Sequence, residues 1–161
     1  MAMNPPAEIT IRAGVMPNDI ELCANIWVRA LASRDGTVDA EAMAQRVRSA
    51  FKNPIVRFAV ATSPRSGFAL VESGRDEPGD AYLHYIAVDP DGVGTGVGTA
   101  LLADSIAHTR LGGFTSLTLE VRATNIRAIA VYTRAGFIPF GTPVAHPLAH
   151  YPMQSYCLAL D

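Results

Sequence analysis

The chain has 161 residues, of which 49% are hydrophobic and 17% are charged, and its formal net charge is −2. This composition is typical of one globular domain and excludes a disordered chain. No basic run suggests nucleic acid, and no apolar stretch approaches the ~18 residues that a membrane span needs. We therefore expect a single cytoplasmic domain over residues 1–161, with 1–7 as a flexible tail and neither nucleic acid nor a membrane as partner.

The spacing of the apolar residues predicts secondary structure in the order βααβββαβαββ. Strands are expected at residues 8–13, on both sides of the turn at 63–67 within 55–73, and at 81–88, 114–122, 137–141 and 155–160. Helices are expected at residues 17–34, 39–51, 99–111 and 124–136. Thr124 and Gly136 are the expected caps of the last helix. This order indicates an α/β domain with a mixed sheet.

Two cysteines, Cys23 and Cys157, have no metal-binding or redox spacing. We expect both to be free thiols in the core, because small buried cysteines without a partner are common in a reducing compartment. No metal is expected.

The stretch "DPDGVGTGVGTALL", residues 89–102, places glycines at 92, 94, 96 and 98 between a strand and a helix. It is not a P-loop, because it contains no Lys, and it is not a dinucleotide fingerprint, because Val97 and Thr99 stand where a third glycine is required. Glycines that lead into a helix N-terminus favour a site for a phosphate or pyrophosphate. The alternative is a turn that binds nothing.

A second pattern lies in the helix expected at 124–136. Asn125, Ala128, Ile129 and Tyr132 are spaced so that they share one face. A polar group at each end of an apolar stripe fits an elongated ligand beside the helix. The alternative is that Asn125 only caps the helix and Tyr132 belongs to the core.

Both stretches resemble motifs of one family. "IAVDPDGVGTGVGTALL" resembles motif A, and "LTLEVRATNIRAIAVYTRAGF" resembles motif B, of the GNAT superfamily of N-acetyltransferases. The resemblance covers roughly residues 81–140. It implies a GNAT-like mixed, mostly antiparallel sheet of about seven strands with about four helices. It also implies an acyl-CoA-dependent N-acyltransferase with acetyl-CoA as cosubstrate.

The resemblance implies a position for each part of acetyl-CoA. The pantetheine arm would run along the strand before the glycines, and backbone amides of the glycine loop would hold the pyrophosphate. The residues concerned are Ile86, Ala87, Val88, Val93, Gly94, Thr95, Gly96, Val97, Gly98, Thr99, Asn125 and Tyr132. Val93 stands where the family usually has Arg or Gln, so we expect weaker binding or compensation by Arg122, Arg127 or Arg134.

For catalysis, the resemblance implies that Tyr132 protonates the leaving thiolate, which suits a phenol of pKa about 10 and a thiol of about 8.5. The string "LEVRATNIRAIAVY" is similar to bacterial ribosomal-protein N-terminal acetyltransferases, which implies Glu120 as the base. Strand alternation places Glu120 on one face with Arg122, so a surface ion pair is the alternative. His84 is another candidate base or else a structural histidine, and water could suffice for an α-amine.

These observations favour direct attack of an amine on acetyl-CoA in a ternary complex, since no Ser or Cys lies in a nucleophile motif. A strand amide near Ala87 or Val88 would stabilise the oxyanion. The acceptor is expected to be a primary amine of a small molecule or peptide. Candidate acceptor-binding residues are Trp27, Arg34, Asp35, His84, His146, His150 and Tyr151.

Two alternatives stay open. The absence of a cation at Val93 fits a GNAT-like module that binds CoA without catalysis, as a sensor or interaction domain. A transferase of a longer acyl group is the other. The sequence also leaves the oligomeric state open, a homodimer included.

Overall fold

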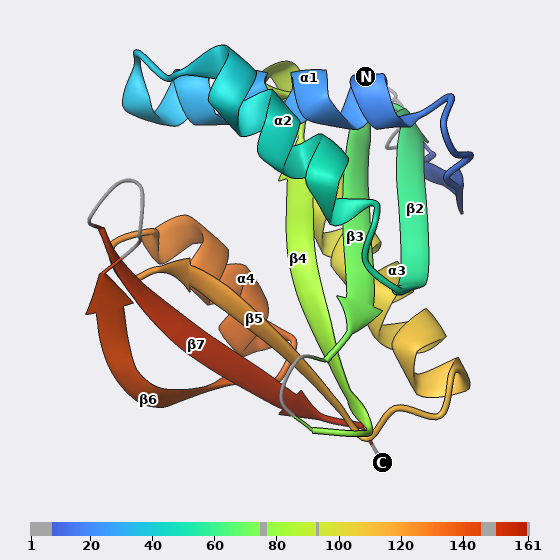
Figure 1. The fold of residues 1–161 in the computed structure, drawn as a ribbon, viewed down its shortest axis with the longest axis vertical. Coiled ribbons are helices and arrows are strands. Elements are labelled where there is room, and N and C mark those ends of the chain that lie inside the picture. Colours follow the sequence, from blue (N-terminus) through green and yellow to red (C-terminus); the bar gives the residue numbers. More distant parts are fainter. Residues whose placement is uncertain (1–7, 75–76, 93, 146–150, 161) are drawn as a thin grey trace, which may run out of the picture.

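A single mixed sheet organises the computed structural model, which describes residues 8–74, 77–92, 94–145 and 151–160. Within these ranges the sheet has seven strands in the order β1-β2-β3-β4-β5-β7-β6 (Figure 1). The predictions for residues 1–7, Val93, His146 and His150 concern residues outside the described ranges.

The elements of the described chain agree with the predicted order. The strands are β1 (Thr10–Ala13), β2 (Ile55–Ser63), β3 (Gly67–Ser73), β4 (Asp80–Val88), β5 (Ser116–Arg122), β6 (Ile138–Ala145) and β7 (Pro152–Ala159). The helices are α1 (Ile20–Asp35), α2 (Ala40–Ala50), α3 (Val97–Leu111) and α4 (Ile126–Arg134), with a short 3₁₀ turn at Pro90–Gly92. Among the described strands only β4 and β5 pair in parallel, which confirms a mixed, mostly antiparallel sheet.

Several predicted boundaries are wrong by a few residues. The N-cap of α4 is Asn125, whose Oδ1 accepts a hydrogen bond from the Ala128 amide at 3.2 Å, and not Thr124. Its C-cap is Ala135, and Gly136 follows at φ +105°, a conformation that favours glycine. β6 and β7 extend beyond the predicted 137–141 and 155–160 because they pair with each other across an irregularity between Phe140 and Val144.

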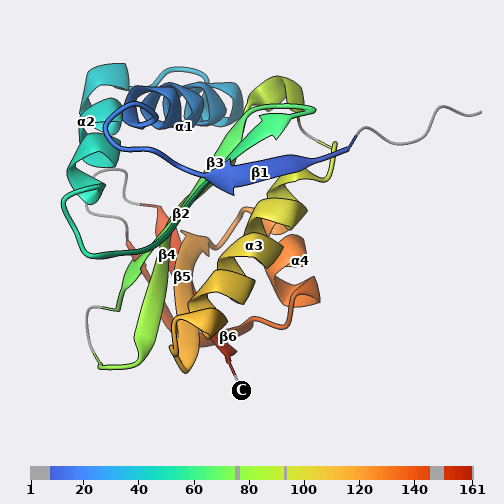
Figure 2. The same cartoon turned by 90° about the vertical axis from the view of Figure 1, so that its right-hand side faces the viewer.

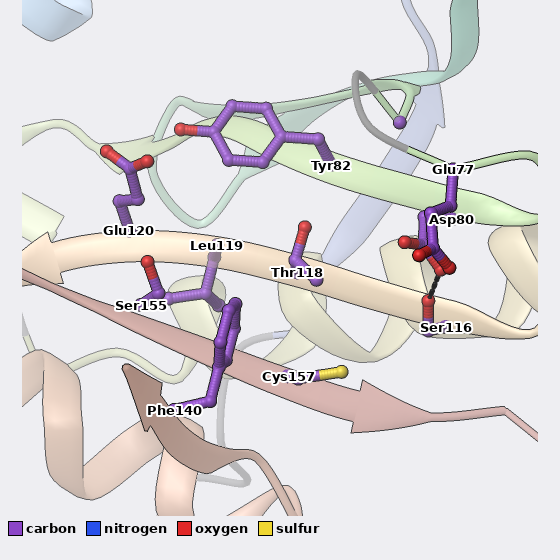
Figure 3. A pocket seen from close by; sticks show the side chains of 11 residues that line it. Glu77, Asp80, Tyr82, Ser116, Thr118, Leu119, Glu120, Phe140, Ser155 and Cys157 are labelled. Atoms are coloured by element: carbon purple, nitrogen blue, oxygen red, sulfur yellow. Dashed lines mark hydrogen bonds between the residues drawn. The ribbon is translucent and has the colours of Figure 1, made fainter. Parts of the chain in front are cut away.

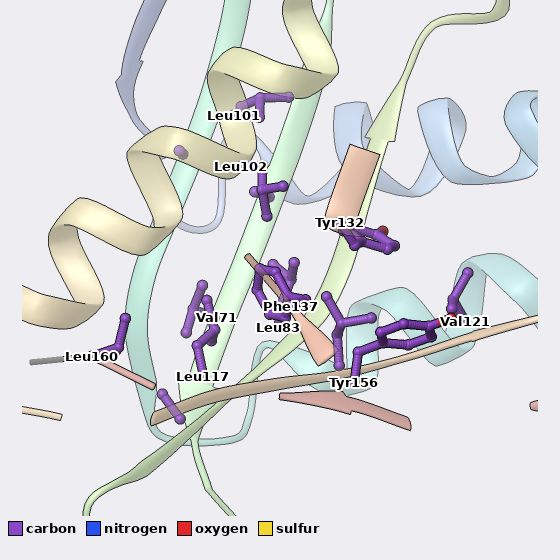
Figure 4. Packing of buried hydrophobic residues seen from close by; sticks show 14 of the residues in the cluster. Val71, Leu83, Leu101, Leu102, Leu117, Val121, Tyr132, Phe137, Tyr156 and Leu160 are labelled. Carbon is purple, nitrogen blue, oxygen red and sulfur yellow. The ribbon is translucent and has the colours of Figure 1, made fainter. Parts of the chain in front are cut away.

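Helices cover both faces of the sheet (Figure 2). On one face, α1 and α2 enclose a core that includes Val47, Phe68 and Tyr85. On the other face, α3 and α4 enclose a second core around Leu101 and Phe137, part of which is drawn in Figure 4. The apolar stripe of each helix is thus buried against the strands between the two layers.

A bulge in β4 changes which face its side chains occupy. Leu70 of β3 lies opposite Tyr85, whereas the next residue, Val71, lies opposite Leu83, so His84 is an extra residue in β4. Before the bulge, Leu83 faces the α3–α4 core. After it, Tyr85 faces the α1–α2 core. The bulge therefore divides β4 into two parts with opposite alternation.

The parallel pairing of β4 with β5 is short. It joins Asp80, Ala81 and Tyr82 to Ser116, Leu117 and Thr118, and Figure 1 shows the two strands diverging beyond this point. We call the point where they separate, just beyond Tyr82 and Thr118, the fork. At Ile86, Ala87 and Val88, the edge of β4 that faces β5 has no strand partner among the described residues.

The two cysteines of the described chain differ in burial, so the expected core position is confirmed for Cys23 and is wrong for Cys157, which lines a pocket. Cys23 and Cys157 are free thiols, Cys23 buried and Cys157 half-buried. Burial raises the pKa of the Cys23 thiol to about 12, which makes it unreactive at neutral pH. Within the described ranges, none of the helices combines the length and apolar character needed to cross a membrane.

The packing of the α3–α4 core predicts the effect of replacing a leucine of α3 by alanine. Leu101 is 0% exposed and Leu111, in the same helix, is 82% exposed. Leu101→Ala should lower the free energy of unfolding by about 2–5 kcal/mol, since it removes buried methyl groups and leaves a cavity. The matched Leu111→Ala should change it by no more than about 0.5 kcal/mol. Urea denaturation measures both, and equal losses in the two variants would contradict the assigned orientation of α3.

Candidate functional site

The fork lies where four chain segments meet. β4 leads into the glycine loop, residues 89–96, and then into α3. β5 leads directly into α4. Because β4 and β5 are parallel, both helices begin at the same end of the sheet, above the open side of the fork (Figure 1). In parallel α/β units, this carboxyl-terminal end of the strands is where ligands bind.

The four glycines of the motif, at 92, 94, 96 and 98, differ in whether the fold itself requires them. Gly94 and Gly96 both have φ of +86°, in the left-handed region, and Gly96 is the N-cap of α3. A Cβ on Gly92 would lie 2.5 Å from the Cβ of Arg65, so packing requires glycine there. Among the described residues, a Cβ on Gly98 would meet only Val88, at an ordinary 3.6 Å. The packing of the described residues therefore does not require glycine at position 98. Close approach of a ligand would require it.

The start of α3 is suited to an anion. The first-turn amides of Val97, Gly98 and Thr99 point along the positive end of the helix dipole, and this turn contains no acidic residue. The Thr95 amide, also expected to bind a phosphate, donates to the Gly92 carbonyl at 3.3 Å. Most of the expected amide donors thus lie at the helix N-terminus.

One of the three arginines proposed as compensating cations lies beside the loop. Arg127 Nη2 would be 3.9 Å from a Cβ on Gly94, so its guanidinium is next to the left-handed turn. Arg122 instead binds Asp35, and Arg134 lines a separate groove of about 330 Å³ between α3 and α4. Arg127 is therefore the arginine placed to supply the charge that position 93 lacks.

Tyr132 lies in the α3–α4 core, where Figure 4 shows it among apolar side chains. It is 8% exposed, and its ring packs edge-on against Phe137 with centroids 5.9 Å apart. Burial raises the pKa of the Tyr132 phenol to about 12, above the value of about 10 expected from sequence. The phenol therefore stays protonated at neutral pH and can donate its proton or a hydrogen bond.

A pocket of about 550 Å³ opens on the face of the sheet opposite this core. Its lining residues are Gly74, Glu77, Asp80, Tyr82, Ser116, Thr118, Leu119, Glu120, Phe140, Ser155 and Cys157. Figure 3 shows the Tyr82 side chain extending along the pocket toward Glu120, and the hydrogen bond from Ser116 to Asp80. Three of these residues are carboxylic acids, and none of the described lining residues is basic, so the pocket suits a cationic group.

A cluster around Arg122 lies further along the same face of β5. Arg122 donates two hydrogen bonds to Asp35, at 2.8 and 2.7 Å, and its Cζ lies 3.6 Å from the centre of the Tyr151 ring. Arg34 Nε also contacts Asp35, at 3.4 Å. Hydrogen bonding to Arg122 lowers the pKa of Asp35. The cluster thus joins the C-terminus of α1 to the C-terminus of β5 and to Tyr151, the residue just before β7.

The structure thus brings three predicted acceptor-binding residues, Arg34, Asp35 and Tyr151, together around Arg122. It does not pair Arg122 with Glu120, which is exposed. Trp27 lies in the α1–α2 layer, edge-on to Tyr85 with ring centroids 4.8 Å apart.

Sequence reasoning did not single out Tyr82, nor Arg122 as the centre of a cluster. The alternation "YLHY" hints that Tyr82 is oriented toward one face, but its position in the pocket depends on pairing with Thr118. It also did not single out Glu72, which contacts His84 Nδ1 through Oε2 at 3.1 Å. The described residues contain no group of three or more His, Cys, Asp or Glu side chains that could hold a metal ion.

Comparison with known proteins assigns the class. The chain belongs to the Acetyltransferase (GNAT) family, whose sequence pattern matches residues 29–137. Over 72 residues it is 44% identical to the [ribosomal protein bS18]-alanine N-acetyltransferase of Escherichia coli, a match covering 45% of this chain and 47% of that protein. Over 81 residues it is 38% identical to the mycothiol acetyltransferase of Cellulomonas flavigena, a match covering 47% of this chain and 23% of that protein. The chain therefore spans less than half of each of these relatives.

Solved structures have the same fold over nearly the whole chain. The ribosomal-protein-S18-alanine N-acetyltransferase of Escherichia coli superposes with a TM-score of 0.74 at 24% identity, covering 96% of this chain and 95% of that one. The yncA protein of Salmonella typhimurium, whose structure includes its cofactor acetyl-CoA, superposes with a TM-score of 0.73 at 20% identity, with coverage of 96% and 95%. These similarities confirm the predicted GNAT fold.

The Arg122 cluster predicts a pH-dependent contribution to stability. Because the folded-state pKa of Asp35 is lowered, its stabilising effect is present above the unfolded pKa of about 3.9 and is lost as the pH falls through the lower folded value. Asp35→Asn should therefore lower the free energy of unfolding by about 1.5–3 kcal/mol at pH 7. The difference from the wild type should shrink below about pH 4.

Urea denaturation at several pH values measures this difference. Asp91→Asn is the matched control, because the Asp91 side chain is 70% exposed and 3.7 Å from Arg29. It should change the free energy of unfolding by no more than about 0.5 kcal/mol at pH 7. A loss on Asp35→Asn that is equally large at pH 3 and pH 7 would contradict an ionic role for Asp35.

Proposed function

We propose that this protein is an N-acetyltransferase that moves the acetyl group of acetyl-CoA to a primary amine of a small molecule or peptide. The observation that carries the proposal is the fork: among the described residues, no strand pairs with the β5-facing edge of β4 at Ile86–Val88, and this edge leads into a left-handed glycine turn at the start of α3. An elongated ligand with a pyrophosphate fits this arrangement, because the strand edge offers backbone hydrogen bonds and the helix start offers amides for an anion. Membership of the GNAT family supports the same proposal.

In this proposal, the residues of the open side of the fork hold acetyl-CoA. The backbone of Ile86, Ala87 and Val88 pairs with the pantetheine arm, in place of the strand partner that β4 lacks there. The first-turn amides of α3 and the Arg127 guanidinium bind the pyrophosphate. Acetyl-CoA supplies an acetyl group activated as a thioester.

The acceptor enters from the opposite face of the sheet, where the 550 Å³ pocket reaches the fork at Tyr82 and Thr118. The exposed Glu120 carboxylate attracts the acceptor as its ammonium form. Once neutral, the amine attacks the thioester carbonyl directly: a C–N bond forms and the C–S bond breaks. The amine loses one proton to a base at the fork, Glu120 or His84, and the departing sulfur gains one from the Tyr132 phenol. A β4 amide near Ala87 or Val88 stabilises the oxyanion.

The names of the relatives support both acceptor classes. One relative is named for a ribosomal protein with an alanine N-terminus, and another for the small molecule mycothiol. The pocket favours an acceptor that carries positive charge, since Glu77, Asp80 and Glu120 are its charged lining residues among those described. A primary amine, which is protonated at neutral pH, meets this condition in either class.

Acetyl-CoA consumption with a panel of amines and N-terminal peptides tests the function. At least one acceptor should be turned over, and Tyr132→Phe should lower its kcat about 10²-fold or more while KM for acetyl-CoA stays the same, because only the proton donor is lost. Tyr156→Phe is the matched control, since Tyr156 is another buried tyrosine of the same core. Binding of acetyl-CoA without turnover of any acceptor would instead support the non-catalytic module.

The glycine loop provides a test that is independent of turnover. Gly98→Ala should raise the stability of the unliganded protein by about 0.5–1 kcal/mol, because alanine is the better helix former and its Cβ has room. The same Cβ should lower affinity for acetyl-CoA at least tenfold, because it occupies the space that the pyrophosphate needs. Calorimetry measures the affinity, and Gly112→Ala at the other end of α3 is the control that should leave it unchanged. Unchanged affinity in Gly98→Ala would place the pyrophosphate elsewhere.

A further inference from the structure

A buried carboxylate lies beside the fork without a role in the scheme above. Glu72 of β3 is 2% exposed, whereas glutamate is rarely buried unless it is paired. Its Oε2 accepts a hydrogen bond from Asn53 Nδ2 at 2.9 Å and contacts His84 Nδ1 at 3.1 Å. The sheet thus holds a histidine and a carboxylate in direct contact, a pair that recurs where histidine acts as a base.

The bulge in β4 is what brings His84 to this carboxylate. In a regular strand, His84 and Tyr85 would point to opposite faces, but their rings are stacked, 4.4 Å apart and 9° from parallel. Both therefore lie on the α1–α2 side of the sheet, which is the side of Glu72 and of the pocket. The His84 side chain is 20% exposed and so reaches solvent.

The position of His84 along β4 coincides with the fork. It is two residues beyond Tyr82, the last residue of β4 that pairs with β5. Its ring centroid is 5.5 Å from that of Tyr82, which lines the pocket. His84 is therefore next to the place where an acceptor amine in the pocket would meet a thioester held in the fork.

We propose that His84 is the catalytic base of this acetyltransferase and that Glu72 is the positioning residue that orients it. The assignment rests on the proposed function. A carboxylate accepts hydrogen bonds only, so contact with Glu72 assigns a hydrogen to Nδ1, and the neutral ring then has its lone pair on Nε2. As the amine nitrogen bonds to the acetyl carbon, its N–H bond breaks and the proton moves to Nε2. The imidazolium so formed is stabilised by the Glu72 charge.

Basicity favours His84 over Glu120 for this step. An ordinary imidazole has a pKa of about 6.5 and an ordinary glutamate one of about 4.3, so histidine is the stronger base toward an ammonium by about two units. Glu120, exposed at the pocket, keeps the role of attracting the acceptor.

Several described groups lie around His84 and can influence its titration. Among the described residues, Glu72 faces it from β3, and the phenols of Tyr82 and Tyr85 flank it on β4. Asn53, between α2 and β2, reaches the shared carboxylate, and α1 contributes the uncharged Trp27 against Tyr85. Glu72 is thus the charged described side chain in direct contact with the imidazole, which makes it the one to vary.

The test uses pH profiles of kcat/KM for the best acceptor of the panel, in His84→Gln and Glu72→Gln. Glutamine at position 84 can still donate a hydrogen bond to Glu72, so the fold should be kept, and thermal unfolding checks this. His84→Gln should lower kcat about 10²-fold or more and leave KM for acetyl-CoA unchanged. It should also remove the acidic limb of the profile, which is the loss of activity at low pH that protonation of His84 would cause. Glu72→Gln should shift that limb to lower pH, because the imidazolium loses its countercharge.

A matched control is available in α3. His108 also contacts a carboxylate, with Nδ1 3.5 Å from Asp104 Oδ2, but it lies on the opposite side of the sheet from Glu72. His108→Gln should keep the kcat and the profile of the wild type. NMR titration of the imidazole protons, assigned by their loss in His84→Gln, should show the same downward shift in Glu72→Gln as the kinetics.

The outcomes separate this inference from the proposed function. Turnover in His84→Gln within about threefold of the wild type, with the same pH profile, would overturn the assignment of His84 and leave the acetyltransferase intact. Loss of the acidic limb in Glu120→Gln but not in His84→Gln would transfer the role to Glu120. If the wild-type protein turns over no acceptor, the proposed function is contradicted, and the assignment of His84, which rests on it, is contradicted with it.

Discussion

The early end of the pairing between β4 and β5 is the constraint on which the rest of the structure depends. After the pair Tyr82 and Thr118 the strands separate, and the α3–α4 core, including Tyr132, fills the space behind them. Backbone groups on the open edge of β4 then need another hydrogen-bond partner, because an unpaired polar group is costly away from water. A ligand chain that lies along this edge would supply one, which is why the fork explains both the shape of the sheet and the proposed site.

Charge is distributed unequally around the fork. On the side of α3, a helix N-terminus and Arg127 create a positive environment, as an anion requires. On the opposite side, the pocket is lined with carboxylates, and the cation nearest along β5, Arg122, is already paired with Asp35. The two substrates of a transfer reaction would therefore approach from opposite faces of the sheet, each toward charge of the opposite sign. Their reacting atoms would then meet where the sheet is open.

Local patterns predicted much of this fold. The glycine loop and the order of the elements follow from backbone freedom and from hydrophobic spacing, which act over a few residues. The predicted caps of α4 were each wrong by one residue. At the N-terminus, neighbouring Thr and Asn can both cap a helix, and only the local backbone geometry selects Asn125. The proposed ion pair of Glu120 with Arg122 was wrong for another reason. Arg122 has a partner, Asp35, that is 87 positions away in the chain.

The sequence by itself determined the family, the elements and the glycine-rich start of α3, because each depends on residues that are neighbours along the chain. Only the tertiary structure decided which side chains share the fork. The register of β3 against β4 makes His84 an extra residue and turns its ring toward Glu72, a carboxylate twelve positions earlier. Strand registers depend on how whole elements pack, and a shift of one residue would turn each side chain to the other face. The proposed choice of base therefore rests on a bulge, which the sequence pattern did not reveal.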